Sequence, residues 1–540
     1  MNPLASTQYA LRGTIVTMDA SNTVLAGGTV CVSEGKIVSV QPSGVPLPPA
    51  FQNILVVDTQ GTIYPGLIEL HNHLSYDVLP LWNVPKRFDN RDQWTAVPEY
   101  HQLVTGPMNV LGKTPGCVQA IVRYVECRCL LGGVTTSQGI ALSSNEGIER
   151  LYRGLVRNVE EPDDPSLPAA ATHILDVEAR DAAKFLAALK RHACVLLHLS
   201  EGTSSTAHQH FDALHLPDNT WAIAPSLAGI HCVALNADDF KTMHDHGASM
   251  VWSPLSNLLL YGQTADIRAA RGSGIRIGLG SDWSPSGSKN LLGELKVARL
   301  VSKHSADPPV FSDFELVAMA TRTAAQILSW DKALGSIETG KLADLLVIDG
   351  VNDDPYAHLL EAAETDIVLV IIKGVPRYGT VPFLQNVAPA TEAWMIGGSP
   401  RILNLAQAVA DPTVGALTLG QAHATLQQCL QNLPTLPAPA AASTLKTSKS
   451  VASSPKPTWT LVLDHLDDGK TAHRPLLPLP GVRTAAPALK TAASKATPLP
   501  LVPLALEPLT VADDKNGFFD RLNQQVNLPA YIKSELPLLY

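Results

Sequence analysis

Short apolar segments alternate with helical segments through the middle of this chain of 540 residues. The apolar segments give eight candidate strands, at 67–70, 133–137, 153–159, 172–176, 194–199, 228–233, 248–252 and 275–280. Eight strands that alternate with helices over about 270 residues are typical of a (β/α)8 TIM barrel in the α/β class, whose active site lies at the carboxyl ends of the strands. The alternation of strands and helices is, by itself, also compatible with a doubly wound open sheet.

Two β-rich segments flank this region. Residues 1–64 contain short alternating strands that are separated by turn residues such as Gly27-Gly28. Residues 335–380 return to short strands and turns after the last helix. We therefore expect one small composite β domain, formed by both flanking segments, beside a barrel domain that spans 65–334.

The character of the chain changes twice beyond residue 380. Residues 381–432 are predicted to be a helical appendage, with Leu419, Ala422, Leu426 and Leu430 as its apolar stripe. Residues 433–505 are rich in Pro, Ala, Ser, Thr and Lys and are predicted to be a linker, apart from a candidate strand at 458–466. Residues 506–540 regain large apolar side chains, which predicts a C-terminal segment that docks on the body or on a partner.

Charge and apolar patterning restrict the binding partners. A formal net charge of -9, with scattered basic residues, gives no footprint for nucleic acid or an anionic membrane. The chain has no apolar stretch of about 18 residues and no signal-peptide pattern at its start. We expect a cytoplasmic protein that acts on a small-molecule substrate, with homo-oligomer formation left open. Its seven cysteines are predicted to be reduced, buried thiols.

Side chains that can bind a metal ion or move a proton follow four of the candidate strands. They are His71 and His73 after the first strand, His198 and Glu201 after the fifth, His231 after the sixth and Asp282 after the eighth. Residues i and i+2 of a strand point to the same face, so His71 and His73 can converge on one ion. A single His-x-His pair is a weak signal, and two further pairs, 208–210 and 244–246, fall in helical stretches. The four strand ends together predict a site.

Order and spacing of short motifs make residues 8–378 similar to the amidohydrolase superfamily, in the branch of cytosine deaminase, S-adenosylhomocysteine deaminase and the triazine hydrolases. The motifs are Pro65-Gly66-Leu67-Ile68-Glu69-Leu70-His71-Asn72-His73, Gly132-Gly133-Val134-Thr135-Thr136, His198-Leu199-Ser200-Glu201, His231-Cys232-Val233, Ser253-Pro254-Leu255-Ser256-Asn257, Gly280-Ser281-Asp282 and Gly340-Lys341-Leu342-Ala343-Asp344. The resemblance implies a TIM barrel with a small β-sandwich from both flanking segments.

The resemblance also implies a metal site and its chemistry. One divalent ion, Zn²⁺ or else Fe²⁺, would be bound by His71, His73, His198 and Asp282. The ion would lower the pKa of its bound water towards about 7 and so supply hydroxide. Glu201 would carry a proton to the substrate, His231 would polarise the substrate or hold the water, and Asp282 would accept the water's proton.

Departures from the family pattern concern the second metal and the substrate. The fourth strand, 172–176, is not followed by the lysine that usually binds a second metal, although Glu178 remains a candidate bridging ligand. Gly202 and Ser281 stand where related deaminases commonly have Thr, so the pocket differs. Trp283, Trp82 and Arg91 are the candidate substrate-binding residues.

The expected function is that of a hydrolase in which metal-bound hydroxide attacks the carbon of a C–N bond. Deamination of a small heterocyclic amine is favoured by the His-x-x-Glu motif. An amidase or cyclic amide hydrolase would use the same site. The remaining alternative belongs to another class of protein. It is a scaffold that has this fold, has lost catalytic activity and acts through its C-terminal tail.

Overall fold

The computed structural model describes residues 2–173, 182–436, 458–463 and 499–540. Five parallel strands lie side by side in chain order, β10 (Ala171–His173), β11 (Val195–Leu199), β12 (Leu227–His231), β13 (Ser249–Trp252) and β14 (Arg276–Leu279). The helices between successive strands are α5 (Ala182–Arg191), α6 (Ser205–Asp212), α7 (Ala237–Asp245) and, between β13 and β14, both α8 (Pro254–Tyr261) and α9 (Ile267–Ser273). Every residue of β11, β12 and β13 is buried, as expected for parallel strands covered on both faces.

Three further parallel strands precede this sheet. They are β5 (Leu67–Ile68), β6 (Val134–Ser137) and β9 (Arg157–Asn158). The first strand lies beside the last, because the Leu70 amide donates a hydrogen bond of 3.2 Å to the Leu279 carbonyl. A parallel bridge between Asn72 and Asp282 extends this contact. Each of the eight predicted strands is therefore confirmed over its described residues, although 174–176 of the fourth lie outside them. The ends of β5 and β14 lie next to each other.

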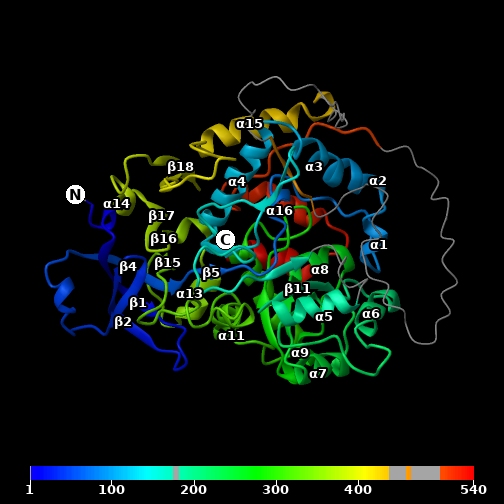
Figure 1. The fold of residues 1–540 in the computed structure, drawn as a ribbon, viewed down its shortest axis with the longest axis horizontal. Coiled ribbons are helices and arrows are strands. Elements are labelled where there is room, and N and C mark those ends of the chain that lie inside the picture. The colour runs from blue at the N-terminus through cyan, green and yellow to red at the C-terminus, as the bar shows by residue number, and fades with distance from the viewer. Residues whose placement is uncertain (1, 174–181, 437–457, 464–498) are drawn as a thin grey trace.

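The two flanking segments pair in a single nine-stranded sheet, in which β15 lies antiparallel to β4. Its members are β1 (Gln8–Val16), β2 (Val24–Ser33), β3 (Lys36–Gln41), β4 (Val56–Pro65), β15 (Leu345–Ile348), β16 (Ile367–Ile372), β17 (Val375–Thr380), β18 (Glu392–Ile396) and β19 (Ser399–Leu403). Figure 1 shows β1, β2 and β4 at one end of the molecule, away from β11 and its helices.

The prediction of a helical appendage at 381–432 is wrong for its first part. Strands β18 and β19 extend the nine-stranded sheet, and Gly397 and Gly398 join them with positive φ angles of 54° and 79°. Two residues with positive φ match the twist of a tight hairpin, which explains why this segment pairs as strands. The second part is confirmed, because α15 (Leu419–Gln431) buries the predicted stripe. Strand β20 (Trp459–Leu461) confirms the strand that was expected within the linker.

The cysteine prediction needs one correction. Cys117 of α4 (Cys117–Leu131) and Cys429 of α15 form a disulfide across 312 residues. The other five cysteines are free and buried, as predicted. A crosslink over so long a loop restricts the unfolded chain and typically stabilises a protein by about 2–4 kcal/mol. The disulfide thus fastens α15 to the body of the protein.

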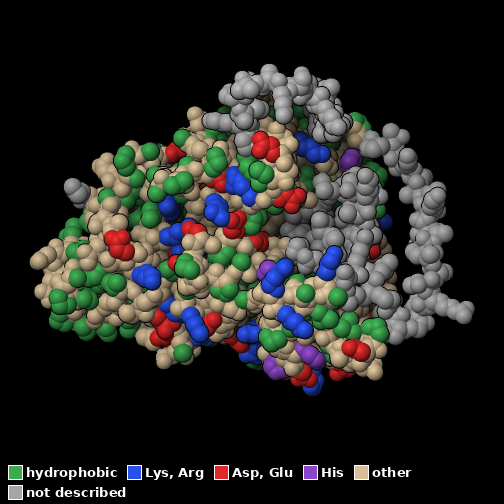
Figure 2. Space-filling model, in the orientation of Figure 1, with side chains coloured by type: hydrophobic (Ala, Val, Ile, Leu, Met, Phe, Trp, Pro, Cys, Tyr) green, Lys and Arg blue, Asp and Glu red, His purple; other side chains and the backbone are tan. Residues whose placement is uncertain are grey.

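The remaining elements complete the covering layers. The helices are α1 (Arg91–Trp94), α2 (Pro98–Tyr100), α3 (Gly106–Leu111), α10 (Leu291–Ser305), α11 (Asp313–Met319), α12 (Arg322–Ile327), α13 (Pro355–Glu361), α14 (Val381–Leu384), α16 (Lys515–Gln524) and α17 (Ala530–Glu535). Strand β7 (Ala141–Ser144) pairs with β20 on one side and with β8 (Glu149–Leu151) on the other. Within the described ranges, no helix has both the length and the apolar character needed to cross a membrane. On the face shown in Figure 2, basic and acidic side chains are interspersed.

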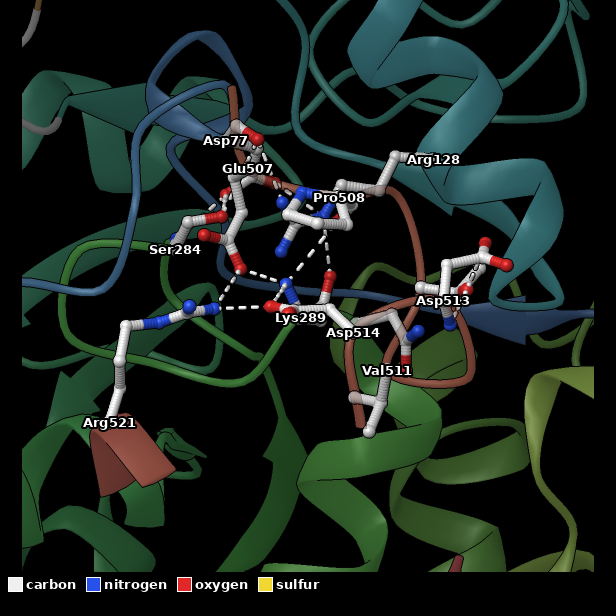
Figure 3. A network of polar contacts seen from close by, with 12 residues as sticks. Asp77, Arg128, Ser284, Lys289, Glu507, Pro508, Val511, Asp513, Asp514 and Arg521 are labelled. Atoms are coloured by element: carbon white, nitrogen blue, oxygen red, sulfur yellow. Dashed lines mark hydrogen bonds and ion pairs between the residues drawn. The ribbon is translucent and has the colours of Figure 1, made fainter. Parts of the chain in front are cut away.

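The C-terminal segment, residues 506–540, docks on the body through a buried ion pair. The Lys289 ammonium contacts the Glu507 carboxylate, and their side chains are 1% and 2% exposed. Lys289 also donates to the Pro508 carbonyl at 3.2 Å, and Arg521 lies 3.6 Å from Glu507 (Figure 3). The pair joins the loop after β14 to the C-terminal segment, which confirms the predicted docking for these residues.

Replacement of Glu507 by glutamine is expected to destabilise the fold by about 3–5 kcal/mol, because it removes the nearest counter-charge of the buried Lys289 and leaves only Asp514, at 3.8 Å, among the carboxylates described near it. Urea unfolding of the full chain measures this change in the free energy of unfolding. The matched control is Asp520→Asn on the exposed side of α16, which is expected to leave stability unchanged. Equal midpoints for the two variants would contradict the role of the buried pair.

Candidate metal centre

The residues after β5 and β14 meet at one carboxylate. Nε2 of His71 lies 3.1 Å and Nε2 of His73 lies 3.3 Å from the same Oδ1 atom of Asp282. The backbone fixes this contact, since the His73 amide donates to the Asp282 carbonyl at 2.7 Å and the Asp282 amide donates to the His71 carbonyl at 3.1 Å. The three side chains are at most 5% exposed. Neighbouring strand ends therefore hold two imidazoles against one carboxylate.

The ends of β11 and β12 bring two more imidazoles to the same place. The ring centres of His71 and His198 lie 4.7 Å apart, and those of His198 and His231 lie 5.2 Å apart. Three overlapping groups each offer ligand atoms within 4.8 Å of one another. The groups are His71, His73 and His198; His71, His231 and Asp282; and His198, Glu201 and His231. The structure thus gathers every residue predicted for the metal or for proton transfer in one buried cluster.

The protonation states of the cluster suit a divalent cation. Burial, with Arg91 and the other histidines nearby, lowers the pKa of His198 well below its usual range, so this imidazole is neutral. Burial opposes ionisation of Asp282, but His71 and His73 outweigh it and hold the pKa of this carboxyl well below its usual range. The neutral imidazole of His198 and the ionised carboxylate of Asp282 are donors of the kind that Zn²⁺ and Fe²⁺ accept in proteins.

Unpaired polar atoms in the cluster also fit a bound ion. Within the described part of the chain, Nδ1 of His71 and Nδ1 of His198 have no hydrogen-bond partner. A buried polar group without a partner is costly, at about 1–3 kcal/mol. A cation at the centre of the cluster would give such lone pairs a partner.

Glu201 is held by two side chains that come from different loops. Tyr261, at the end of α8, donates its hydroxyl to Oε1 of Glu201 at 2.8 Å. Nη1 of Arg91, at the start of α1, lies 3.3 Å from Oε2. Trp94 donates its indole N–H to the Tyr261 oxygen at 2.8 Å, which links the two supports. The carboxylate therefore has a fixed orientation beside the histidines.

The backbone after Glu201 explains a departure from the family pattern. Gly202 pairs with Asn90 in an isolated bridge and has a φ of 134°. A Cβ atom at Gly202 would lie 2.4 Å from the Asp89 carbonyl oxygen, which is too close for any side chain. The Thr203 amide donates to that same carbonyl at 2.7 Å. Glycine at 202 thus lets the loop before α1 pack directly against the Glu201 turn.

His231 faces Glu201 from the end of β12, with Nε2 at 3.9 Å from Oε2 of the carboxylate. Its Nδ1 atom lies 3.0 Å from the Asn257 amide nitrogen, and Thr264 donates to Oδ1 of Asn257 at 3.0 Å. The Thr264 contact orients the amide so that it donates to Nδ1. Burial lowers the pKa of His231 to about 4, so the ring is neutral and its proton sits on Nε2. His231 therefore presents an N–H towards Glu201.

Glu69 is a second buried carboxylate, and it contacts residues at the ends of the strands that carry the histidine cluster. It accepts hydrogen bonds from the Asn72 amide at 3.1 Å and from the Ser137 hydroxyl at 3.2 Å. The Ser281 amide donates to it at 3.2 Å, and the Ser281 hydroxyl also contacts it. Burial raises the pKa of Glu69 to about 7. Glu69 thus ties together the ends of β5, β6 and β14, and the hydroxyl of residue 281 takes part in this connection.

The three predicted substrate-binding residues lie around the cluster in an aromatic shell. The Trp283 ring lies 5.2 Å from the His73 ring and 5.1 Å from the Tyr76 ring. Trp82 stacks on Phe88 with ring centres 6.2 Å apart, and it contacts Tyr100, whose ring centre lies 6.2 Å from that of Trp283. Arg91 points at Glu201, as described above. All three are buried.

The other histidine pairs lie elsewhere. His208 and His210 are on α6, and His208 pairs with Asp239 at 2.8 Å. His244 is on α7, and His246 caps its end. Glu178, the candidate ligand for a second metal, lies outside the described residues.

The sequence pattern of the amidohydrolase family matches residues 62–377, which is more than half of the chain. The chain belongs to this family. A 5-methylthioadenosine/S-adenosylhomocysteine deaminase from Symbiobacterium thermophilum is 25% identical over 405 residues, which cover 67% of this chain and 91% of that protein.

Solved structures share the fold at lower sequence identity. A guanine deaminase from Bradyrhizobium japonicum aligns with a TM-score of 0.53 and 18% identity, over 68% of this chain and 99% of that one. An adenosine deaminase from Xanthomonas campestris with bound zinc aligns with a TM-score of 0.52 and 18% identity, over 69% and 93%.

Proposed function

We propose that this protein is a metal-dependent hydrolase that deaminates a small heterocyclic amine. The observation that carries the proposal is the convergence of His71, His73, His198 and Asp282 on one buried point, with Glu201 beside them. Membership of the amidohydrolase family supports hydrolysis of a C–N bond. The similar proteins named as deaminases support release of ammonia from an aminoheterocycle.

We further propose that residues 65–334 form a (β/α)8 barrel and that the site lies at its carboxyl-terminal face. The contact between β5 and β14 supports closure at one edge. The Ala170 amide donates to the Val159 carbonyl at 2.8 Å, which joins the two parallel sheets at the other edge. We assign residues 1–64 and 335–380 to one composite β domain, whose nine-stranded sheet continues through β18 and β19 to residue 403.

The four proposed ligands would hold one divalent ion, for which zinc is favoured. Bound there, such an ion would act as a Lewis acid that lowers the pKa of a water molecule and makes it nucleophilic near pH 7. The Asp282 carboxylate is placed to accept the proton that this water loses.

Glu201 would transfer protons during the reaction. Deamination adds water to the carbon that bears the amino group, and the amine must be protonated before it leaves as ammonia. The attacking water supplies two protons, of which Asp282 would accept one. Glu201 would take up the other and deliver it to the amine, because Tyr261 and Arg91 fix its carboxylate beside the cluster. His231 would donate its Nε2 proton to an acceptor atom of the substrate, since Asn257 occupies its other nitrogen.

The aromatic shell favours a planar substrate. Trp283 and Tyr76 present ring faces and edges next to His73. Offset and edge-to-face ring contacts each stabilise an aromatic pair by about 0.5–1.5 kcal/mol beyond burial alone. We assign Trp283 to the wall of the substrate pocket, with Arg91 and Trp82 in the loop that covers it.

Ammonia release from a panel of compounds tests the proposal. The panel contains adenosine, 5-methylthioadenosine, S-adenosylhomocysteine and guanine, with cyclic amides and N-acyl amines as competing classes. We expect turnover of at least one aminoheterocycle by zinc-loaded protein. The control variant His208→Ala, on the outer helix α6, is expected to retain full activity. Turnover of the amides alone would establish an amidase instead, and no turnover of any class would contradict a hydrolase.

A further inference from the structure

We propose that Gln525 and Asn527 of the C-terminal segment are positioning residues for Glu201. The inference rests on the function proposed above, because it concerns the carboxylate that transfers the proton. In the sequence, both residues are 441 to 443 positions away from the loop residues that they contact. They act on the loop 82–91, which connects β5 to α1, and on the end of α8.

Gln525 binds the loop 82–91 with both ends of its side-chain amide. Its Oε1 accepts a hydrogen bond from the Val84 amide at 3.1 Å. Its Nε2 donates to the Trp82 carbonyl at 3.0 Å. The side chain is almost fully buried, and its contacts have the reciprocal pattern of paired strands. The buried amide therefore holds the backbone of the loop 82–91 in one conformation.

Asn527 joins this loop to helix α8. Its Nδ2 donates to the Lys86 carbonyl at 3.0 Å and to the Leu259 carbonyl at 2.8 Å. The Phe88 amide adds a direct bond to the Leu260 carbonyl at 3.0 Å. One side chain thus uses both of its N–H groups to hold two active-site segments at a fixed spacing.

The loop 82–91 and helix α8 each end in a residue that contacts the Glu201 carboxylate. The loop 82–91 leads to Arg91, which contacts Oε2 of the carboxylate. Helix α8 ends at Tyr261, two residues after Leu259, and Tyr261 donates to Oε1. The loop also reaches the turn that follows Glu201, through the Asp89 carbonyl and the Thr203 amide. A shift of the loop relative to α8 would therefore change the position of the carboxylate.

A third contact anchors the same C-terminal segment to the loop after Asp282. Lys289 holds Glu507 there, as Figure 3 shows, and the Ser284 amide donates to Asp77 at 2.8 Å. Trp82 is tied to this loop too, because its amide donates to the Pro285 carbonyl at 2.8 Å. The C-terminal segment thus contacts the loops that follow the first, seventh and eighth parallel strands.

The test uses the full chain loaded with zinc and the double variant Gln525→Met, Asn527→Ala. We expect kcat for ammonia release to fall by about 10- to 100-fold with little change in KM, since small displacements of a catalytic group cost rates of this order. Bound zinc is expected to stay as in the wild type. Hydrogen exchange of the amides in 82–91 is expected to accelerate. Gln524→Met, at an exposed neighbouring position, is the matched control and should behave as the wild type.

The outcomes separate the two proposals. Equal kcat and equal exchange in the double variant and the control would overturn the positioning role, and so would a higher kcat or a loss confined to KM. If the double variant does not fold, Asn527→Ala alone is measured, because this side chain is only half-buried. A wild type that releases no ammonia overturns deamination. Exchange in 82–91 then still decides whether Gln525 and Asn527 hold the loop.

Discussion

Replacement of His198 by alanine is expected to remove the bound metal ion and ammonia release together. His198 lies in two of the three ligand groups, and its ring is buried between His71 and His231. Loss of residues that only support metal ligands costs 10- to 100-fold in affinity or activity, so loss of a ligand should exceed about 100-fold. Mass spectrometry of the purified variant measures the metal, and the ammonia assay measures the rate.

The matched control is His208→Ala, which removes a partly exposed imidazole on the adjacent helix α6. It is expected to keep both the metal ion and the rate. A His198→Ala variant that retains a full metal complement would show that this residue is not a ligand. A variant that loses the metal but retains its rate would show that the ion takes no part in the reaction.

Replacement of Glu201 by glutamine is expected to leave the metal ion bound and to abolish turnover. Glutamine keeps an oxygen that can accept the Tyr261 hydroxyl, so the fold of the site is preserved. It carries no titratable proton, and proton transfer by a positioned side chain contributes about 10²- to 10⁴-fold to rates. We therefore expect kcat to fall by this factor while the metal content stays constant.

Glu99→Gln provides the control for this change, because Glu99 is exposed on the short helix α2 and lies outside the cluster. Its rate should equal that of the wild type. If Glu201→Gln turns over at the wild-type rate, Glu201 does not transfer the proton. If it loses the metal ion, Glu201 has a ligand role instead.

Much of the fold could be predicted because buried parallel strands leave a strong local signal. Segments such as 195–199 and 227–231 are continuous apolar runs, and the structure confirms them as β11 and β12. The hairpin of β18 and β19 was missed, since its strands alternate weakly and its turn signal is the single pair Gly397-Gly398. The disulfide was also missed, because its cysteines are 312 residues apart and occupy two separate helices.

The cluster itself could be predicted from the ends of strands, since parallel strands bring their carboxyl ends together. The supports of Glu201 could not. Arg91 and Tyr261 reach the carboxylate only through the packing of two loops, which no local pattern encodes. One signal was present: Asn257 and Tyr261 are four residues apart on α8 and therefore share a face of that helix. Gln525 and Asn527 left no signal, because their partners are backbone groups.

The metal content of the purified full chain, measured together with ammonia release before and after chelation, tests the proposed hydrolytic site most directly. We predict close to one zinc or iron ion per chain, loss of ammonia release when the ion is removed, and recovery when zinc is added back. Protein that carries no metal after growth with zinc and iron, and that gains no activity when either is added, would contradict a metal-dependent hydrolase.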